Sequence, residues 1–169
     1  MTSEENILNL IGPLFLDDLE NEFKRICGLR IGRKEKLEAF HSKLAGLRFL
    51  DPACGCGNFL VVAYRELRRI EMDVVKELPE LSGHGADQRV LGIDMLFKVN
   101  VNQFYGIEIG DFPAQIAKVA LWLTDHQMNR KASEVFGRYY ARIPLKVSPT
   151  IVCGNALKIN WEGLAPKPN

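Results

Sequence analysis

The sequence lacks an excess of charge of either sign. Its 169 residues include 22 Lys and Arg and 21 Asp and Glu, which leaves a formal net charge of +1. A domain that binds nucleic acid by itself usually carries a visible basic excess, because it must neutralise phosphates. If the protein acts on nucleic acid, we expect most of the phosphate-binding surface to belong to other parts of a larger protein.

The sequence also lacks the segments that direct a chain into or across a membrane. Residues 1–5 are polar and acidic rather than basic and then apolar, and no apolar run approaches the thickness of a bilayer. The four cysteines do not suggest a disulfide framework, and Cys54-x-Cys56 lacks the paired spacing of a zinc site. We therefore expect a cytoplasmic protein with reduced cysteines, no metal and no membrane partner.

What is present is an alternation of helical and extended patterns. Predicted helices cover residues 3–27 (interrupted near Gly12-Pro13), 34–44, a segment from Asn58 to Pro79, and a segment opened by Asp111 and Pro113. Predicted strands cover residues 47–50, 101–109 and 150–153, and the tail from Lys158 reads as a loop. This order is typical of the first half of a parallel α/β sheet. We predict an α/β, partial Rossmann-like domain over residues 47–169 and an N-terminal helical segment over residues 1–46.

Residue types also suggest which helical faces are buried. The face expected to be buried on the helix after Asp111 consists of Ile116, Ala117, Ala120, Leu121 and Leu123. Arg65, Arg68 and Arg69 share a helix with Glu66 and Glu71, a pattern more typical of a solvated face than of a phosphate track.

The strongest local pattern is Asp51-Pro52-Ala53-Cys54-Gly55-Cys56-Gly57-Asn58-Phe59. Its glycines let the backbone pass close to a ligand and turn into a helix, which Asn58 can cap. The helix N-terminus offers N–H groups to an anionic group, and Asp51 can accept a cationic amine. A ligand with an amino acid end and a nucleoside end would satisfy both. A nicotinamide-dinucleotide fingerprint needs a third glycine where Leu60 stands, and a plain strand-to-helix turn is the structural alternative.

Two further polar residues follow predicted strands. Glu108 ends the second strand, where a carboxylate can accept both hydroxyls of a ribose or simply face solvent. Asn155 follows the third strand, where its side chain can accept from an adenine amino group or form an ordinary Asx turn. Because strand ends of a parallel sheet meet at one edge, both residues are expected near the glycine loop.

The residues from Asp51 to Phe59 resemble motif I, Asp-Pro-x-x-Gly-x-Gly-x-Phe, of the amino-group DNA methyltransferases. Residues 105–109 and 117–129 look like the MmeI-like branch of that group, which contains large type II restriction–modification proteins that methylate adenine in DNA. Thr2-Ser3 resembles the segment that opens this domain in the family, with Met1 where the family has Tyr. The resemblance covers essentially the whole chain.

The resemblance implies S-adenosyl-L-methionine as cofactor and a bacterial or archaeal cytoplasm as location. The implied cofactor-binding residues are Thr2, Asp51, Pro52, Ala53, Cys54, Gly55, Gly57, Asn58, Phe59, Glu108, Ile109, Asn155 and Ala156. The backbone of residues 53–55, with Asp51 and Thr2, would hold the methionine moiety. Glu108 would bind the ribose and Ile109 would pack on the adenine. Asn155 and the Ala156 N–H would contact the adenine edge.

The chain departs from the family by an absence. The catalytic Asn-Pro-Pro-Tyr or Asn-Pro-Pro-Phe motif, which in the family holds a flipped adenine, does not occur in residues 1–169. Double-stranded DNA is therefore expected as partner of the parent enzyme through regions absent here, and the isolated chain is expected to be inactive. The fourth strand that would flank residues 47–50 is absent too, so we expect either self-association through that edge or covering of the edge by the chain's own tail. A small-molecule or RNA methyltransferase and a non-catalytic nucleotide-binding module remain alternatives.

Overall fold

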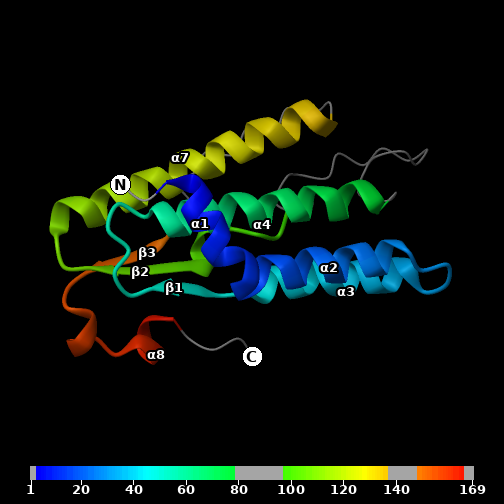
Figure 1. Ribbon diagram of the computed structural model, residues 1–169. Coiled ribbons are helices and arrows are strands. Elements are labelled where there is room, and N and C mark those ends of the chain that lie inside the picture. Colours follow the sequence, from blue (N-terminus) through cyan, green and yellow to red (C-terminus); the bar gives the residue numbers. More distant parts are fainter. Residues whose placement is uncertain (1–2, 79–96, 137–147, 166–169) are drawn as a thin grey trace.

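Three parallel strands lie at the centre of the structure, a computed structural model that describes residues 3–78, 97–136 and 148–165 (Figure 1). They are β1 (Phe49–Asp51), β2 (Phe104–Glu108) and β3 (Thr150–Cys153), in the order β1-β2-β3. Asp51 pairs with Gly106, and Glu108 pairs with Cys153. The carboxyl ends of all three strands therefore meet at one edge of the sheet, as the parallel α/β prediction required.

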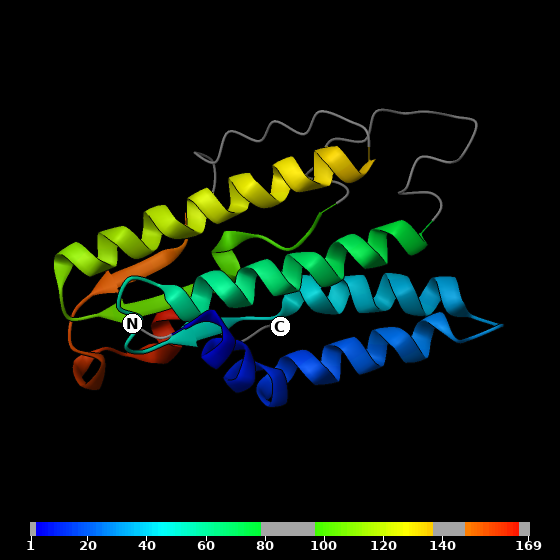
Figure 2. The same ribbon diagram turned by 45° about the horizontal axis from the view of Figure 1, so that its top comes forward.

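Two long helices connect these strands and pack together on one face of the sheet. They are α4 (Asn58–Glu77) and α7 (Asp111–Phe136), which lie side by side in Figures 1 and 2. Tyr64 of α4 is fully buried against the Phe104 ring of β2, with ring centroids 5.3 Å apart and an edge-on arrangement. This aromatic contact fixes the start of α4, and hence the preceding loop, relative to β2.

The N-terminal part is helical, as predicted. α1 (Glu4–Ile11) passes through the π-helical turn η1 (Gly12–Leu16) into α2 (Asp17–Cys27), and α3 (Arg33–Gly46) returns toward β1. The predicted interruption at Gly12-Pro13 is confirmed as a change of helix type, because Pro13 has no N–H to donate to the preceding turn. The α2–α3 hairpin extends away from the sheet beyond the amino end of β1 (Figures 1 and 2).

The second strand is shorter than predicted. Residues Val101–Gln103 form the 3₁₀ turn η2 instead of extended chain, because Asn100 and Gln103 cap each other in a capping box. The Gln103 amide nitrogen also donates to the carbonyls of Leu44 and Leu47, at 2.9 Å each. The turn thereby ties the end of α3 to the start of β2, a tertiary contact that strand periodicity does not reveal.

Two other expectations about the helices are corrected. Ala117 and Leu121 are buried as predicted, but Ile116 and Leu123 are 37% and 55% exposed, because the buried face of α7 continues through Ala114. The tail is not only loop. It contains the short turns η4 (Ala156–Lys158) and α8 (Trp161–Leu164), the second capped by the Asn160 side chain.

Arg68 is also not on a solvated face. It is completely buried, and its guanidinium donates to Glu71, Asn129 and the Val99 carbonyl, the last two at 2.8 and 3.3 Å. Glu71 in turn accepts the Val99 N–H and contacts His41 Nε2, each at 2.9 Å. Burial of this charge is offset by the ion pair with Glu71 and by the bonds of both terminal nitrogens, while Nε has no partner among the described residues, and the network links α3, α4 and α7.

No helix in the described ranges is both long and apolar enough to cross a membrane.

Candidate functional site

The glycine loop turns directly from β1 into α4. Gly55 and Gly57 have positive φ values of 54° and 84°, a conformation that glycine adopts without steric cost. The Cys54 N–H donates to the Ile107 carbonyl of β2 at 3.0 Å, and the Gly57 N–H closes the turn onto the Cys54 carbonyl at 2.8 Å. The loop is therefore held across the end of the sheet by backbone hydrogen bonds.

Gly57, rather than the predicted Asn58, caps α4. Gly57 supplies no capping side chain, and Asn58 is the first residue of the helix. A Cβ at position 57 would lie 3.0 Å from the Ala117 Cβ of α7, so a side chain there would require α7 to shift. No described side chain caps the first N–H groups of α4, which leaves them available to a ligand.

Glu108 joins the end of β2 to the glycine loop. One carboxylate oxygen accepts the Gly55 N–H at 2.9 Å, and the other accepts the Gly110 N–H at 2.9 Å. A carboxylate has about four acceptor positions, so these two bonds leave room for two further donors. Glu108 is thus both a fixed part of the loop and a free acceptor at its surface.

Asp51 lies at the other side of the same loop. Its side chain accepts the Ala53 N–H at 3.0 Å, and the residue is partly buried. The carboxylates of Asp51 and Glu108 therefore both contact the glycine loop, which gives this end of the sheet a negative potential.

Burial and this negative potential both affect the pKa of the Cys54 thiol. It is 6% exposed, and its pKa is raised to about 11, first by burial and then by the charges of Asp51 and Glu108. A thiol with such a pKa stays protonated at neutral pH and is a poor nucleophile. Cys54 is therefore a packing residue, and a Cβ on Gly106 would lie only 2.7 Å from its Sγ.

The end of β3 reaches the same edge. The Gly154 N–H donates to the Glu108 carbonyl at 2.8 Å, so the next residues follow directly beside β2. The Asn155 side chain accepts the Leu157 N–H at 2.9 Å, which is the Asx turn weighed above. Ala156 accepts the Trp161 indole N–H at 2.7 Å, while its own N–H has no partner among the described residues.

The structure brings together most of the residues singled out from the sequence. The loop from Asp51 to Phe59, Glu108 and Asn155 all lie at the carboxyl edge of the sheet. Ile109 is 74% exposed beside Glu108, and Thr2 lies outside the described residues.

Sequence reasoning missed the backbone contribution of Gly110, which binds the second oxygen of Glu108. Its only signal is the Gly-Asp pair that precedes α7. Within the described parts of the chain, no three His, Cys, Asp or Glu side chains gather as metal ligands.

The fold and this edge define the class of protein. A parallel sheet with a glycine loop, a strand-end acidic residue and helices on its face is the arrangement of an α/β methyltransferase-like fold. The family model of the MmeI DNA-methyltransferase domain matches residues 29–169, and the chain belongs to this family.

Relatives of known name agree with this assignment. DNA methyltransferase A of Bacillus subtilis (strain 168) is 39% identical over 168 residues, which are 98% of this chain and 18% of that protein. A relative from Methanocaldococcus jannaschii is 32% identical over 164 residues, covering 91% of this chain and 12% of that protein.

A solved structure is also similar to this chain. It is the type IIL restriction–modification enzyme MmeI in complex with DNA, with a TM-score of 0.85 and 58% identity, over 96% of this chain and 21% of that one. This chain thus spans about a fifth or less of the length of the relatives that it matches.

Proposed function

We propose that this chain is the S-adenosylmethionine-binding portion of a site-specific DNA adenine-N6 methyltransferase that belongs to a restriction–modification enzyme. Membership of the family makes the chain a DNA-methyltransferase domain. The cofactor, the adenine target and the inactivity of the isolated chain are the proposal.

The observation that carries the proposal is the double contact of Glu108. It holds the Gly55 N–H with one oxygen and the Gly110 N–H with the other, directly beside the open end of α4. A nucleoside whose ribose hydroxyls donate to the remaining acceptor positions would be positioned between β2 and the glycine loop. S-adenosylmethionine would need this acceptor for its ribose, together with a polar cradle for its amino acid end.

The remaining residues of the edge fit the same ligand. The space beside Gly55 is open, since apart from Gly55 and its chain neighbours no atom lies within 4 Å of a Cβ built there. Asp51 and the free N–H groups at the start of α4 would bind the ammonium and carboxylate of the amino acid end. Ile109 would pack on the adenine ring, and the unpartnered Ala156 N–H would serve a ring nitrogen. Asn155 would accept from the amino group with the lone pair that Leu157 leaves free.

When bound, the cofactor would supply an electrophilic methyl group on its sulfonium. The chain's own part is to hold it in one orientation, with the negative charges of Asp51 and Glu108 facing the cationic groups. Cys54 and Gly57 would contribute by fixing the loop against β2 and α7 through their backbone, Phe59 by packing on the core, and Pro52 as part of the same loop.

Calorimetry with the 169-residue chain tests the cofactor proposal. S-adenosylmethionine and S-adenosylhomocysteine should bind, and adenosine alone should bind more weakly, because it lacks the amino acid end. Equal affinity for all three would favour a nucleotide-binding module that does not recognise the amino acid. No binding of any of them would contradict the proposal.

Transfer of labelled methyl groups to unmethylated genomic DNA tests the activity. The chain contains no Asn-Pro-Pro-aromatic sequence, so it should incorporate label only at background level. Transfer needs the nitrogen of an unstacked base aligned with the methyl group and roughly 3 Å away, and no described residue is assigned to hold that base. A longer polypeptide that contains such a motif and a DNA-recognition region should methylate adenine. Label incorporated by the 169-residue chain itself, or methylation of a base other than adenine by the longer polypeptide, would contradict the proposal.

A further inference from the structure

The positive charge of this nearly neutral chain is concentrated in residues 22–48, which include the second half of α2, the turn to α3 and α3 itself, whereas the first half of α2 is acidic, with Asp17, Asp18 and Glu20. Between Glu22 and Arg48 the sequence contains eight Lys and Arg but only three Asp and Glu, whereas the whole chain has a net charge of +1. The rest of the molecule is therefore net negative. Such separation of charge creates a local positive potential that the total does not reveal.

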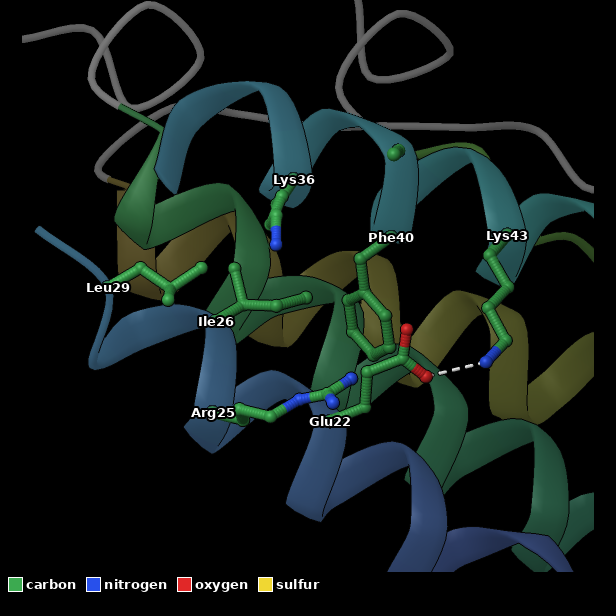
Figure 3. A pocket seen from close by; sticks show the side chains of 8 residues that line it. Glu22, Arg25, Ile26, Leu29, Lys36, Phe40 and Lys43 are labelled. Carbon is green, nitrogen blue, oxygen red and sulfur yellow. Dashed lines mark hydrogen bonds and ion pairs between the residues drawn. The ribbon is translucent and has the colours of Figure 1, made fainter. Parts of the chain in front are cut away.

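A groove of about 410 Å³ lies between α2 and α3, at the centre of this basic region (Figure 3). Ile26 and Phe40, which are 5% and 2% exposed, form its apolar floor. Phe40 is supported from the side by Phe23, with ring centroids 6.1 Å apart. The floor is thus rigid, and the polar groups around it stand on two packed helices.

Two cations of the groove have no counter-charge. Lys43 forms an ion pair with Glu22 at 2.5 Å, which neutralises both. The side chains of Arg25 and Lys36 form no ion pair or hydrogen bond with any described residue, and Figure 3 shows both side chains extending into the space between the helices. Arg25 comes from α2 and Lys36 from α3, so a ligand in the groove would meet positive charge from both sides.

The groove and the glycine loop lie beyond opposite ends of β1. α3 ends at Gly46, β1 follows at once, and the loop begins at the opposite end of β1. With the usual rise per residue of helix and strand, Phe40 and Asp51 are separated by roughly 25 Å along this path. One turn of B-form DNA measures about 34 Å, so both places are within reach of one turn of duplex.

We propose that the α2–α3 groove binds backbone phosphates of the DNA duplex on one side of the target base. The proposal rests on the proposed function only in placing the target base at the glycine loop. The exposed Arg30, in the turn between α2 and α3, extends the basic surface beyond the groove, which suits a polyanion better than a single small anion. Phosphate contacts of this kind position a duplex without reading its sequence.

Fluorescence anisotropy with the 169-residue chain and a labelled duplex of about 20 base pairs tests the proposal over a series of salt concentrations. The test variant is Arg25→Gln/Lys36→Gln. The matched control is Arg130→Gln/Lys131→Gln on α7, which removes the same charge from an exposed surface elsewhere. We expect the test variant to weaken binding about tenfold and to lower the salt slope by about 1.8, the value for two lost phosphate contacts. The control should stay within about twofold of the unchanged chain.

Three results would overturn the proposal. The first is that the unchanged chain does not bind DNA at low salt. The second is that the test variant and the control lose equal DNA affinity. The third is that poly-glutamate binds in preference to DNA through Arg25 and Lys36, which would assign the groove to an acidic protein. Calorimetry with S-adenosylmethionine on the same variants separates this proposal from the previous one. Lost DNA binding with intact cofactor binding supports the groove, whereas failure of cofactor binding in every chain would affect the proposed function alone.

Discussion

At the scale of single residues, Glu108 determines the geometry of the candidate cofactor site. Glu108→Gln replaces one acceptor oxygen by an NH₂ group that faces either the Gly55 or the Gly110 N–H, and two donors cannot bond each other. We expect S-adenosylmethionine affinity to fall by about 1–3 kcal/mol, the cost of a lost hydrogen bond to a charged group. Calorimetry measures the change, and the exposed Glu134→Gln is the control. Unchanged affinity would remove Glu108 from the site.

Cys54 gives a prediction about pH. Its pKa of about 11 in the folded protein is above the ordinary value of 9.0. As pH rises from 9 toward 11, the thiol ionises in the unfolded chain but stays protonated in the folded one, so the folded state loses relative stability. Below pH 9 this contribution is fully present.

The measurement is the free energy of unfolding in urea at several pH values, for the unchanged chain and for Cys54→Ala. The unchanged chain should lose up to about 2 kcal/mol more than Cys54→Ala between pH 8 and 11. Since both chains share every other titrating group, identical pH profiles would show that the thiol is not shifted.

At the scale of structural elements, the close passage of the glycine loop over α7 can be tested by comparing two glycines. Gly57 and Gly32 both precede a helix, with φ values of 84° and 68°. A Cβ at position 57 meets Ala117 at 3.0 Å, whereas nothing lies within 4 Å of a Cβ at position 32. Both changes to Ala incur backbone strain, but only Gly57→Ala adds overpacking.

We expect Gly32→Ala to lower the free energy of unfolding by about 1 kcal/mol and Gly57→Ala by a further 1–3 kcal/mol or so. Gly57→Ala should also weaken cofactor binding, because α4 and α7 must move apart beside the loop. Urea denaturation of the two variants measures the difference. Equal losses would mean that α7 yields to the added methyl group at no cost.

At the scale of the whole molecule, the free edge of β1 is the main exposed feature of the sheet. Among the described residues β1 pairs only with β2, and its other side borders an apolar groove lined by Leu10, Leu14, Phe49, Leu50 and Phe59. An unpaired strand beside apolar side chains is a template for another chain. The 169-residue chain should therefore self-associate as its concentration rises.

Light scattering over a range of concentrations, combined with amide hydrogen exchange, tests this expectation. Leu50→Lys, which places a charge at the partly buried edge, should reduce association, and Leu123→Lys at an exposed position on α7 is the control. A clean monomer whose β1 amides exchange freely would contradict the prediction.

The sequence by itself determined the class of fold and the composition of the candidate site. The order of apolar periods located all three strands to within a few residues, and β3 at its observed bounds. The glycine spacing from Asp51 to Phe59 and the acidic residue at the end of β2 identified the loop and its partner. These signals are local, so they can be read without knowing what packs against them.

The tertiary structure decided what depends on contacts between distant segments. Gln103 forms part of a turn because its side-chain amide donates to carbonyls at the end of α3. Arg68 is buried because its charge is paired with Glu71 and one of its N–H groups donates to Asn129. The same holds for charge. A sum of +1 hides the basic segment 22–48, and only folding places Arg25 and Lys36 on two sides of one groove, where the acidic Glu22 is already paired with Lys43.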